Sequence, residues 1–214
     1  MVHLGYIFAI KTLAGKHFHV AQLLYEHGAI ADVRGSYEKT LLHGISIPRD
    51  HEIAQWLLRH GADTNIQDDD GWTSLHDAAV RGNFEGAQLL LKHNADITIK
   101  NIDGEIQLHG ASRHGSLDVA RLLLVYGADV NARSNDGSTP LHLASHGRWF
   151  GGAREGRFAV ACVLLEHGAD IRTVDNSGRT AFQVVDQDHE EMIKLLSEHV
   201  ENMCDTTAHP HNCH

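Results

Sequence analysis

The chain has 214 residues, 42% of them hydrophobic and 21% charged, a composition typical of an ordered protein rather than a disordered or collagenous one. Its 28 acidic and 18 basic residues give a formal charge of -10, which repels phosphate backbones and argues against nucleic acid as a partner. The three scattered cysteines are too few for a disulfide framework and favour an intracellular location, cytoplasmic or nuclear.

The first apolar stretch, Leu4 to Ile10, is too short to cross a membrane and has no basic leader. We therefore expect neither a membrane segment nor a targeting signal. No turn or linker precedes this stretch, so one interpretation is that the chain is the terminal part of a larger protein.

A strict spacing organises the residues that follow. Four histidines lie 33 residues apart, at His43, His76, His109 and His142. Around them the sequence recurs as TLLHGIS, TSLHDAA, IQLHGAS and TPLHLAS, and each block is followed by an apolar run and an HGAD-like ending. A fixed period of this length is the signature of a repeat protein.

Each repeat predicts a tight turn followed by two helices. Asp-Gly pairs at 70–71, 103–104 and 136–137 supply the positive φ that a hairpin turn needs. The threonine that opens most of the blocks is placed to cap a first helix, and the leucine-rich run gives a second helix its apolar face. Each second helix is expected to end in a left-handed residue, at Gly61, Asn94, Gly127 and Gly168.

These blocks resemble the ankyrin repeat, whose period is 33 residues and whose signature is TPLHxA. The resemblance implies an all-α solenoid of about six helix-turn-helix repeats with short β-hairpin fingers. We place an ankyrin repeat domain at 1–203 and a disordered His-rich tail at 204–214. The repeats are expected at about 1–34, 35–67, 68–100, 101–133, 134–174 and 175–203.

The last two repeats depart from the period. The fifth is eight residues longer, and we place the excess between its helices at residues 148–155, a position that is often part of a binding face. Trp149 and Phe150 in this insertion are interface candidates, and the alternative is that they pack back onto the fifth repeat. The sixth has drifted to TAFQ, with Gln183 in place of histidine, and its second helix is polar, as expected of a terminal cap.

The nineteen histidines do not indicate catalysis. Eight of them belong to the repeat pattern, either in the TPLH-like blocks or at the ends of the second helices. The tail from Cys204 to His214 matches no zinc spacing, so we expect disorder there, with metal binding as the alternative. Cys162 is expected to be a half-exposed thiol on an outer helix face. We predict no enzyme, no catalytic residue, no cofactor and no metal.

The resemblance implies a protein-protein interaction module, such as a scaffold or adaptor. Ankyrin repeats typically recognise proteins through the finger tips and the exposed side of the first helices, which line a concave groove. We expect a monomer with an unidentified protein partner, and the net charge favours a partner with basic patches. The implied protein-binding positions are Tyr37, Lys39, Ile47, Asp69, Asp70, Trp72, Arg81, Ile102, Glu105, Arg113, His114, Asn135, Ser138, His146, Trp149 and Phe150.

Several alternatives stay open. Trp72 is the first hot-spot candidate, unless it packs across to the next finger. Trp56 aligns with Leu89 and is expected in the core. Asn131 resembles the asparagine that an oxygen-dependent hydroxylase modifies in some ankyrin repeats, or it only forms hydrogen bonds in the link to the next finger. The competing function is a structural or spacer array within a larger multidomain protein.

Overall fold

The computed structural model describes residues 31–32, 34–44, 51–146, 154–186 and 189–207, with side chains given up to residue 200. The chain divides into two compact units, residues 1–107 and 108–214. Helix α7 (Gln107–His114) begins at the last residue of the first unit. The expected first repeat and most of the expected insertion, including Ile47, Trp149 and Phe150 among the candidate residues, lie outside the described parts.

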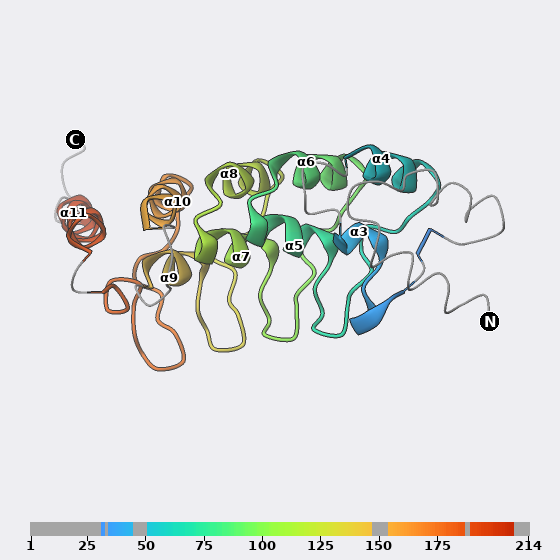
Figure 1. The fold of residues 1–214 in the computed structure, drawn as a ribbon. Helices are drawn as coiled ribbons and strands as arrows, with labels where there is room; N and C mark the ends of the chain where they lie inside the picture. The colour runs from blue at the N-terminus through green and yellow to red at the C-terminus, as the bar shows by residue number, and fades with distance from the viewer. Residues whose placement is uncertain (1–30, 33, 45–50, 147–153, 187–188, 208–214) are drawn as a thin grey trace, which may run out of the picture. The chain divides into compact units, whose positions relative to one another are not determined.

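The first unit contains two layers of helices above a row of turns (Figure 1). A short 3-10 helix, η1 (Ser36–Glu38), precedes α3 (Leu41–Gly44), which packs against α5 (Ser74–Arg81). The second layer consists of α4 (His51–Arg59) and α6 (Phe84–Lys92), which contact each other. Buried leucines fill the space between the layers. The buried alanines are small and let the first helices approach closely.

The second unit repeats this arrangement and then departs from it. Helix α8 (Leu117–Val125) packs against α10 (Arg154–Glu166), and α9 (Pro140–Ser145) lies beside α10 and above its finger (Figure 1). Helix α11 (Glu190–Thr207) contacts α10 and includes residues 204–207, which the sequence analysis assigned to the tail. The described residues contain helices and isolated bridges but no extended strand, which confirms the expected all-α class.

The histidine of each TPLH-like block connects its helix to the next turn. In α9 the Thr139 amide donates to His142 Nδ1 at 3.2 Å. Because Nδ1 accepts, Nε2 carries the proton, and it donates to the Arg179 carbonyl at 3.0 Å. In the three earlier blocks the histidine Nε2 makes the corresponding contact, with a carbonyl 29 residues later instead of 37.

The fingers are closed turns rather than long hairpins. In the fifth repeat the Ser134 amide donates to the Ser138 carbonyl at 3.0 Å, and Gly137 has a φ of 80°. Neighbouring fingers are joined by backbone hydrogen bonds, such as Asn176 N to the Asp136 carbonyl at 2.9 Å. The predicted left-handed ends of the second helices are confirmed, with φ values of 85°, 64°, 88° and 85° at Gly61, Asn94, Gly127 and Gly168.

Three sequence expectations need correction or refinement. Trp56 is only half-buried, and its ring stacks on His60 with centroids 4.1 Å apart, so the core placement was wrong. Residues 154–155 of the expected insertion belong to α10. The sixth repeat has a turn at 181–184 where a first helix was expected, closed by a bridge between His146 and Val185.

Candidate functional site

A hollow of about 200 Å³ lies in the second unit between the fingers and the first helices. Three of its lining residues, Arg113, Ser138 and His146, are predicted protein-binding positions. The remaining lining residues come from the two fingers, from α9 and from the turn after it: Asp136, His142, Leu143, Asp175, Arg179 and Val184. The hollow therefore lies where the resemblance places a recognition surface.

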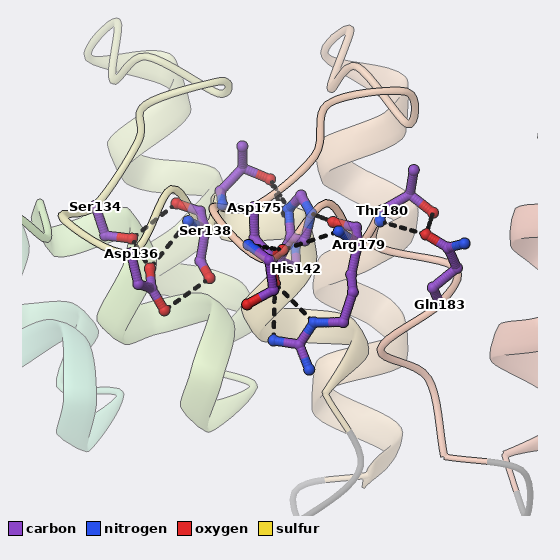
Figure 2. Close-up of polar contacts among 10 residues, drawn as sticks. Ser134, Asp136, Ser138, His142, Asp175, Arg179, Thr180 and Gln183 are labelled. Atoms are coloured by element: carbon purple, nitrogen blue, oxygen red, sulfur yellow. Dashed lines mark hydrogen bonds and ion pairs between the residues drawn. The ribbon is translucent and has the colours of Figure 1, made fainter.

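One wall of the hollow is the finger of the fifth repeat, which is held by Asp136 (Figure 2). The Asp136 carboxylate accepts from the Ser138 amide at 3.0 Å and from the hydroxyls of Ser134 and Ser138. Burial raises the pKa of Asp136, but these hydrogen bonds outweigh it and hold the pKa below its usual value. Asp136 therefore remains ionised and fixes the shape of this wall.

The opposite wall is the finger of the sixth repeat, where Arg179 folds back onto Asp175 (Figure 2). Arg179 Nε and Nη2 contact the same Asp175 oxygen at 2.9 and 2.8 Å, and the second oxygen accepts from the Ser177 and Arg179 amides. Although burial raises the pKa of Asp175, these donors lower it overall. Half of the Arg179 side chain stays exposed, so a guanidinium edge remains accessible at the rim.

His142 lies at the base of the hollow and is buried. Burial lowers the pKa of His142, and this effect exceeds the opposing hydrogen bond to the Arg179 carbonyl. In a neutral imidazole with Nδ1 accepting a hydrogen bond and Nε2 donating one, no free lone pair is left to accept a proton from a substrate. His142 therefore has a structural role here rather than that of a general base.

In the first unit the corresponding surface contains a half-exposed lysine between two buried carboxylates. Lys39 Nζ lies 3.1 Å from Asp68 and 3.4 Å from Asp77. Burial raises the pKa of Asp77 although Lys39 opposes it, while burial lowers the pKa of Lys39 and the two carboxylates more than restore it. Lys39 thus neutralises buried charge and is not a free cation.

Large apolar side chains at two finger tips of this unit face solvent. Tyr37 is 75% exposed and Ile102 is 62% exposed. Tyr37 also has a φ of 61°, a value that a bulky residue rarely adopts. Asp69 and Asp70 lie on the finger between them, where the Asp69 amide donates to the Tyr37 carbonyl and the Ile102 amide to the Asp70 carbonyl. Apolar and acidic side chains thus share one edge of the unit.

The structure orders the remaining predicted contact residues by exposure. Arg81, His114 and Asn135 are exposed, whereas Trp72 is half-buried. Two of the candidates, Glu105 and Ser138, are buried. The Trp72 ring lies 5.9 Å from the His76 ring. The side chains of Trp72, Glu105 and Ser138 therefore form part of the surface's shape more than they project from it.

Sequence reasoning did not select Asp136, Asp175 or Arg179 as site residues. Asp136 is one residue before Gly137, whereas Asp175 is three residues before Gly178, at the position that Ser134 holds in the fifth repeat. Arg179 follows Gly178 directly, as Ser138 follows Gly137. Ser138 was selected by this alignment, and extending it by one repeat finds Arg179.

Asn131 and Cys162 can also be placed. Asn131 Nδ2 donates to the Gly168 carbonyl at 3.2 Å, and its Oδ1 accepts from the Asp170 amide at 2.8 Å, so its amide bridges successive repeats. Cys162 is half-exposed as expected, and burial, with Glu166, raises the pKa of its thiol. A raised pKa leaves little thiolate for nucleophilic chemistry.

Two further kinds of site, a metal centre and a membrane-spanning helix, are absent from the described parts of the chain. Within them no group of three or more His, Cys, Asp or Glu side chains is placed to hold a metal ion. None of the helices described is both long enough and apolar enough to span a bilayer. The side chains of the His-rich tail lie outside these residues.

Comparison with known proteins agrees with the repeat architecture. A family model described as ankyrin repeats (3 copies) matches residues 7–101 and 98–172. Together these matches span more than half of the 214 residues. A search of curated proteins found no match to the chain.

Proposed function

Because the chain belongs to the ankyrin repeat family, whose members are generally protein-protein interaction modules, we propose that it binds a protein partner through its finger tips and first helices. The observation that carries the proposal is the hollow of the second unit, which is lined by the predicted positions Arg113, Ser138 and His146. Its walls are fixed by internal hydrogen bonds, so a partner meets a preformed surface and little conformational entropy is lost on binding.

The finger tips of the first unit supply a second, apolar set of candidate contacts. Tyr37 and Ile102 expose large side chains, and tyrosine is among the residues that dominate many interfaces. The neighbouring Asp69 and Asp70 favour a partner segment with basic side chains. The expected insertion around Trp149 and Phe150 stays a further candidate for partner contacts, and it lies outside the described residues.

Alanine variants of the finger tips test this function. Affinity capture from matched cell extract, with Tyr37→Ala and Ile102→Ala in one chain, is expected to lose a partner that the unaltered protein retains. Val125→Ala is the matched control, because Val125 is 78% exposed on α8 away from the fingers. An additional Asp69→Lys, Asp70→Lys variant is expected to bind more weakly and with less salt dependence. Equal loss in the Val125 variant would refute the assignment of the surface.

The second candidate function, a structural array within a larger protein, is supported by one observation. An apolar hollow of about 470 Å³ is formed around Phe182 and Val200 on the last repeat, and both side chains are about two-fifths exposed. A stacked neighbouring domain would cover such a surface. If Phe182→Asp abolishes capture of a partner while the finger variants leave it intact, this second candidate replaces the first.

A further inference from the structure

A second polar cluster lies in the second unit at the starts of α10 and α11. In the repeat pattern the residue before the second helix is a short polar cap, such as Asn83, whose side chain accepts from the Gly86 amide at 3.1 Å. The matching positions in the fifth and sixth repeats hold Arg157 and His189. Two successive repeats thus carry, at the position aligned with Asn83, a side chain that can donate to an anion; Arg157 lies in the first turn of α10, and His189 directly precedes α11.

Both replacements are buried. Arg157 is 4% exposed and His189 is 5% exposed. Arg157 Nη1 donates to the His146 carbonyl at 2.8 Å, at the C-terminal end of α9. Neither Arg157 Nε nor His189 Nε2 has a hydrogen-bond partner among the described residues. The neighbouring Ser145 Oγ, at the end of the same helix, is likewise buried and unpartnered within that part of the chain.

The electrostatic environment of the cluster is cationic. Burial lowers the pKa of Arg157, and the nearby Arg154 lowers it further. Burial, Arg154 and Arg157 in turn lower the pKa of His189, against weaker opposing effects of Glu191 and Asp186. Among the described residues no carboxylate forms an ion pair with either arginine.

A buried guanidinium without a counter-charge is costly, because desolvation penalises it by several kcal/mol. The carbonyl at the C-terminal end of α9 offsets part of this cost by accepting from Arg157 Nη1. It leaves Arg157 Nε without a hydrogen-bond acceptor among the described residues. An arginine edge of this kind matches the oxygens of a carboxylate or phosphate. Arg154 is exposed and therefore marks the side from which such a group can enter.

We propose that Arg154, Arg157 and His189 form a binding site for an oxyanion, supplied either by an acidic side chain of a protein partner or by free phosphate. The two sources share the same chemistry, since each presents two or more oxygens to the Arg157 Nε and His189 Nε2 atoms. None of these three residues lines the hollow between the fingers, so the test below does not depend on the function proposed above.

The test uses the full chain labelled with ¹⁵N and follows the histidine side-chain resonances while inorganic phosphate is added at pH 7 and constant ionic strength. His189→Gln identifies the His189 signal by its loss. The proposal expects that signal to shift saturably, with a dissociation constant of about 1 mM for a single small anion. A parallel titration with acetate distinguishes the sources, because a carboxylate site shifts the signal with acetate as well, whereas a phosphate site does not.

Two further variants separate a specific site from general charge attraction. Arg154→Gln, which removes the exposed arginine, is expected to weaken binding about tenfold, as for the loss of one charge-assisted hydrogen bond. Arg121→Gln, an equal charge change on the exposed face of α8, is the matched control and should leave the affinity unchanged. Absence of a saturable shift with either anion, or equal weakening in both variants, would overturn the proposal and leave buried water as the partner of these atoms.

Discussion

At the scale of single residues, the histidine of each TPLH-like block connects two repeats through its two ring nitrogens. His142 accepts from the Thr139 amide through Nδ1 and donates to the Arg179 carbonyl through Nε2. Only the neutral ring can do both. In the sixth repeat Gln183 replaces the histidine. Its Oε1 accepts from the Thr180 amide at 2.9 Å, so within the described residues it reproduces the contact of Nδ1 at the start of the block but not the contact of Nε2 with the next finger.

This chemistry predicts that acid destabilises the protein through His142. Its pKa is lowered in the folded state by burial, so the unfolded state binds the proton first as the pH falls. The stabilising contribution is complete above the unfolded pKa of about 6.5 and is lost as the pH falls toward the folded pKa, at about 1.4 kcal/mol for each unit of lowering.

Urea unfolding at pH 7.5 and pH 5.5 measures this effect. The free energy of unfolding of the unaltered protein is expected to fall more steeply with acid than that of His142→Gln, which keeps a cap acceptor without the titrating ring. The variant also controls for the other groups that titrate in this range, His189 among them. Identical pH slopes in the two proteins would show that His142 does not contribute.

At the scale of the elements, the finger glycines differ from the helix-ending glycines in what surrounds them. Gly137 and Gly127 have similar φ values of 80° and 88°. A Cβ on Gly137 would lie 2.5 Å from Asn176 Oδ1 and 2.9 Å from the Asn176 amide nitrogen, whereas a Cβ on Gly127 would meet nothing within 4 Å. The finger glycine is needed for close approach as well as for its conformation.

Alanine substitution separates these two requirements. Gly127→Ala is expected to cost about 1 kcal/mol, the strain of a left-handed non-glycine residue. Gly137→Ala is expected to cost at least about 1 kcal/mol more, because the Asn176 backbone must also move. Thermal unfolding of the two variants measures the difference. Equal losses would mean that neighbouring fingers are not packed at the distance the structure gives.

The elements also show where sequence reasoning succeeds and where it does not. The period, the turns and the helix ends were predictable because each depends on a local residue type, such as Gly61 or Asn94 with a positive φ. The turn at 181–184 was not predictable, because a first helix also depends on the contact between its histidine and the next finger. Gln183 caps Thr180 but reaches no further carbonyl in the described part of the chain. Trp56 was misplaced for a related reason, since alignment with a leucine does not account for the stacking on His60.

The candidate site was predictable only in part. Alignment to the family selected exposed finger positions such as Tyr37 and Ile102, because exposure there follows from the repeat. It did not identify the ion pair of Asp175 with Arg179, which depends on a contact between side chains. Nor did it identify Arg157, whose burial follows from the extra turn at the start of α10.

At the scale of the whole molecule, the proposed function depends on which surface a partner contacts. The charge of -10 and the acidic finger residues favour a basic partner, but the net charge belongs to the whole chain and does not by itself assign a contact surface. Geometry is more discriminating. The finger tips and the hollow present exposed side chains on rigid, hydrogen-bonded turns, whereas the exposed side chains of α8 project from an outer helix.

The most direct test is site-specific photo-crosslinking in cell extract. A photoreactive amino acid is placed singly at Ile102, at Arg113 or, as the outer-face control, at Val125, whose side chain is more exposed than that of Ile102. The account predicts a discrete protein adduct from positions 102 and 113 and none from position 125. An adduct from position 125 alone, or the same adduct from all three, would contradict recognition through the fingers and first helices.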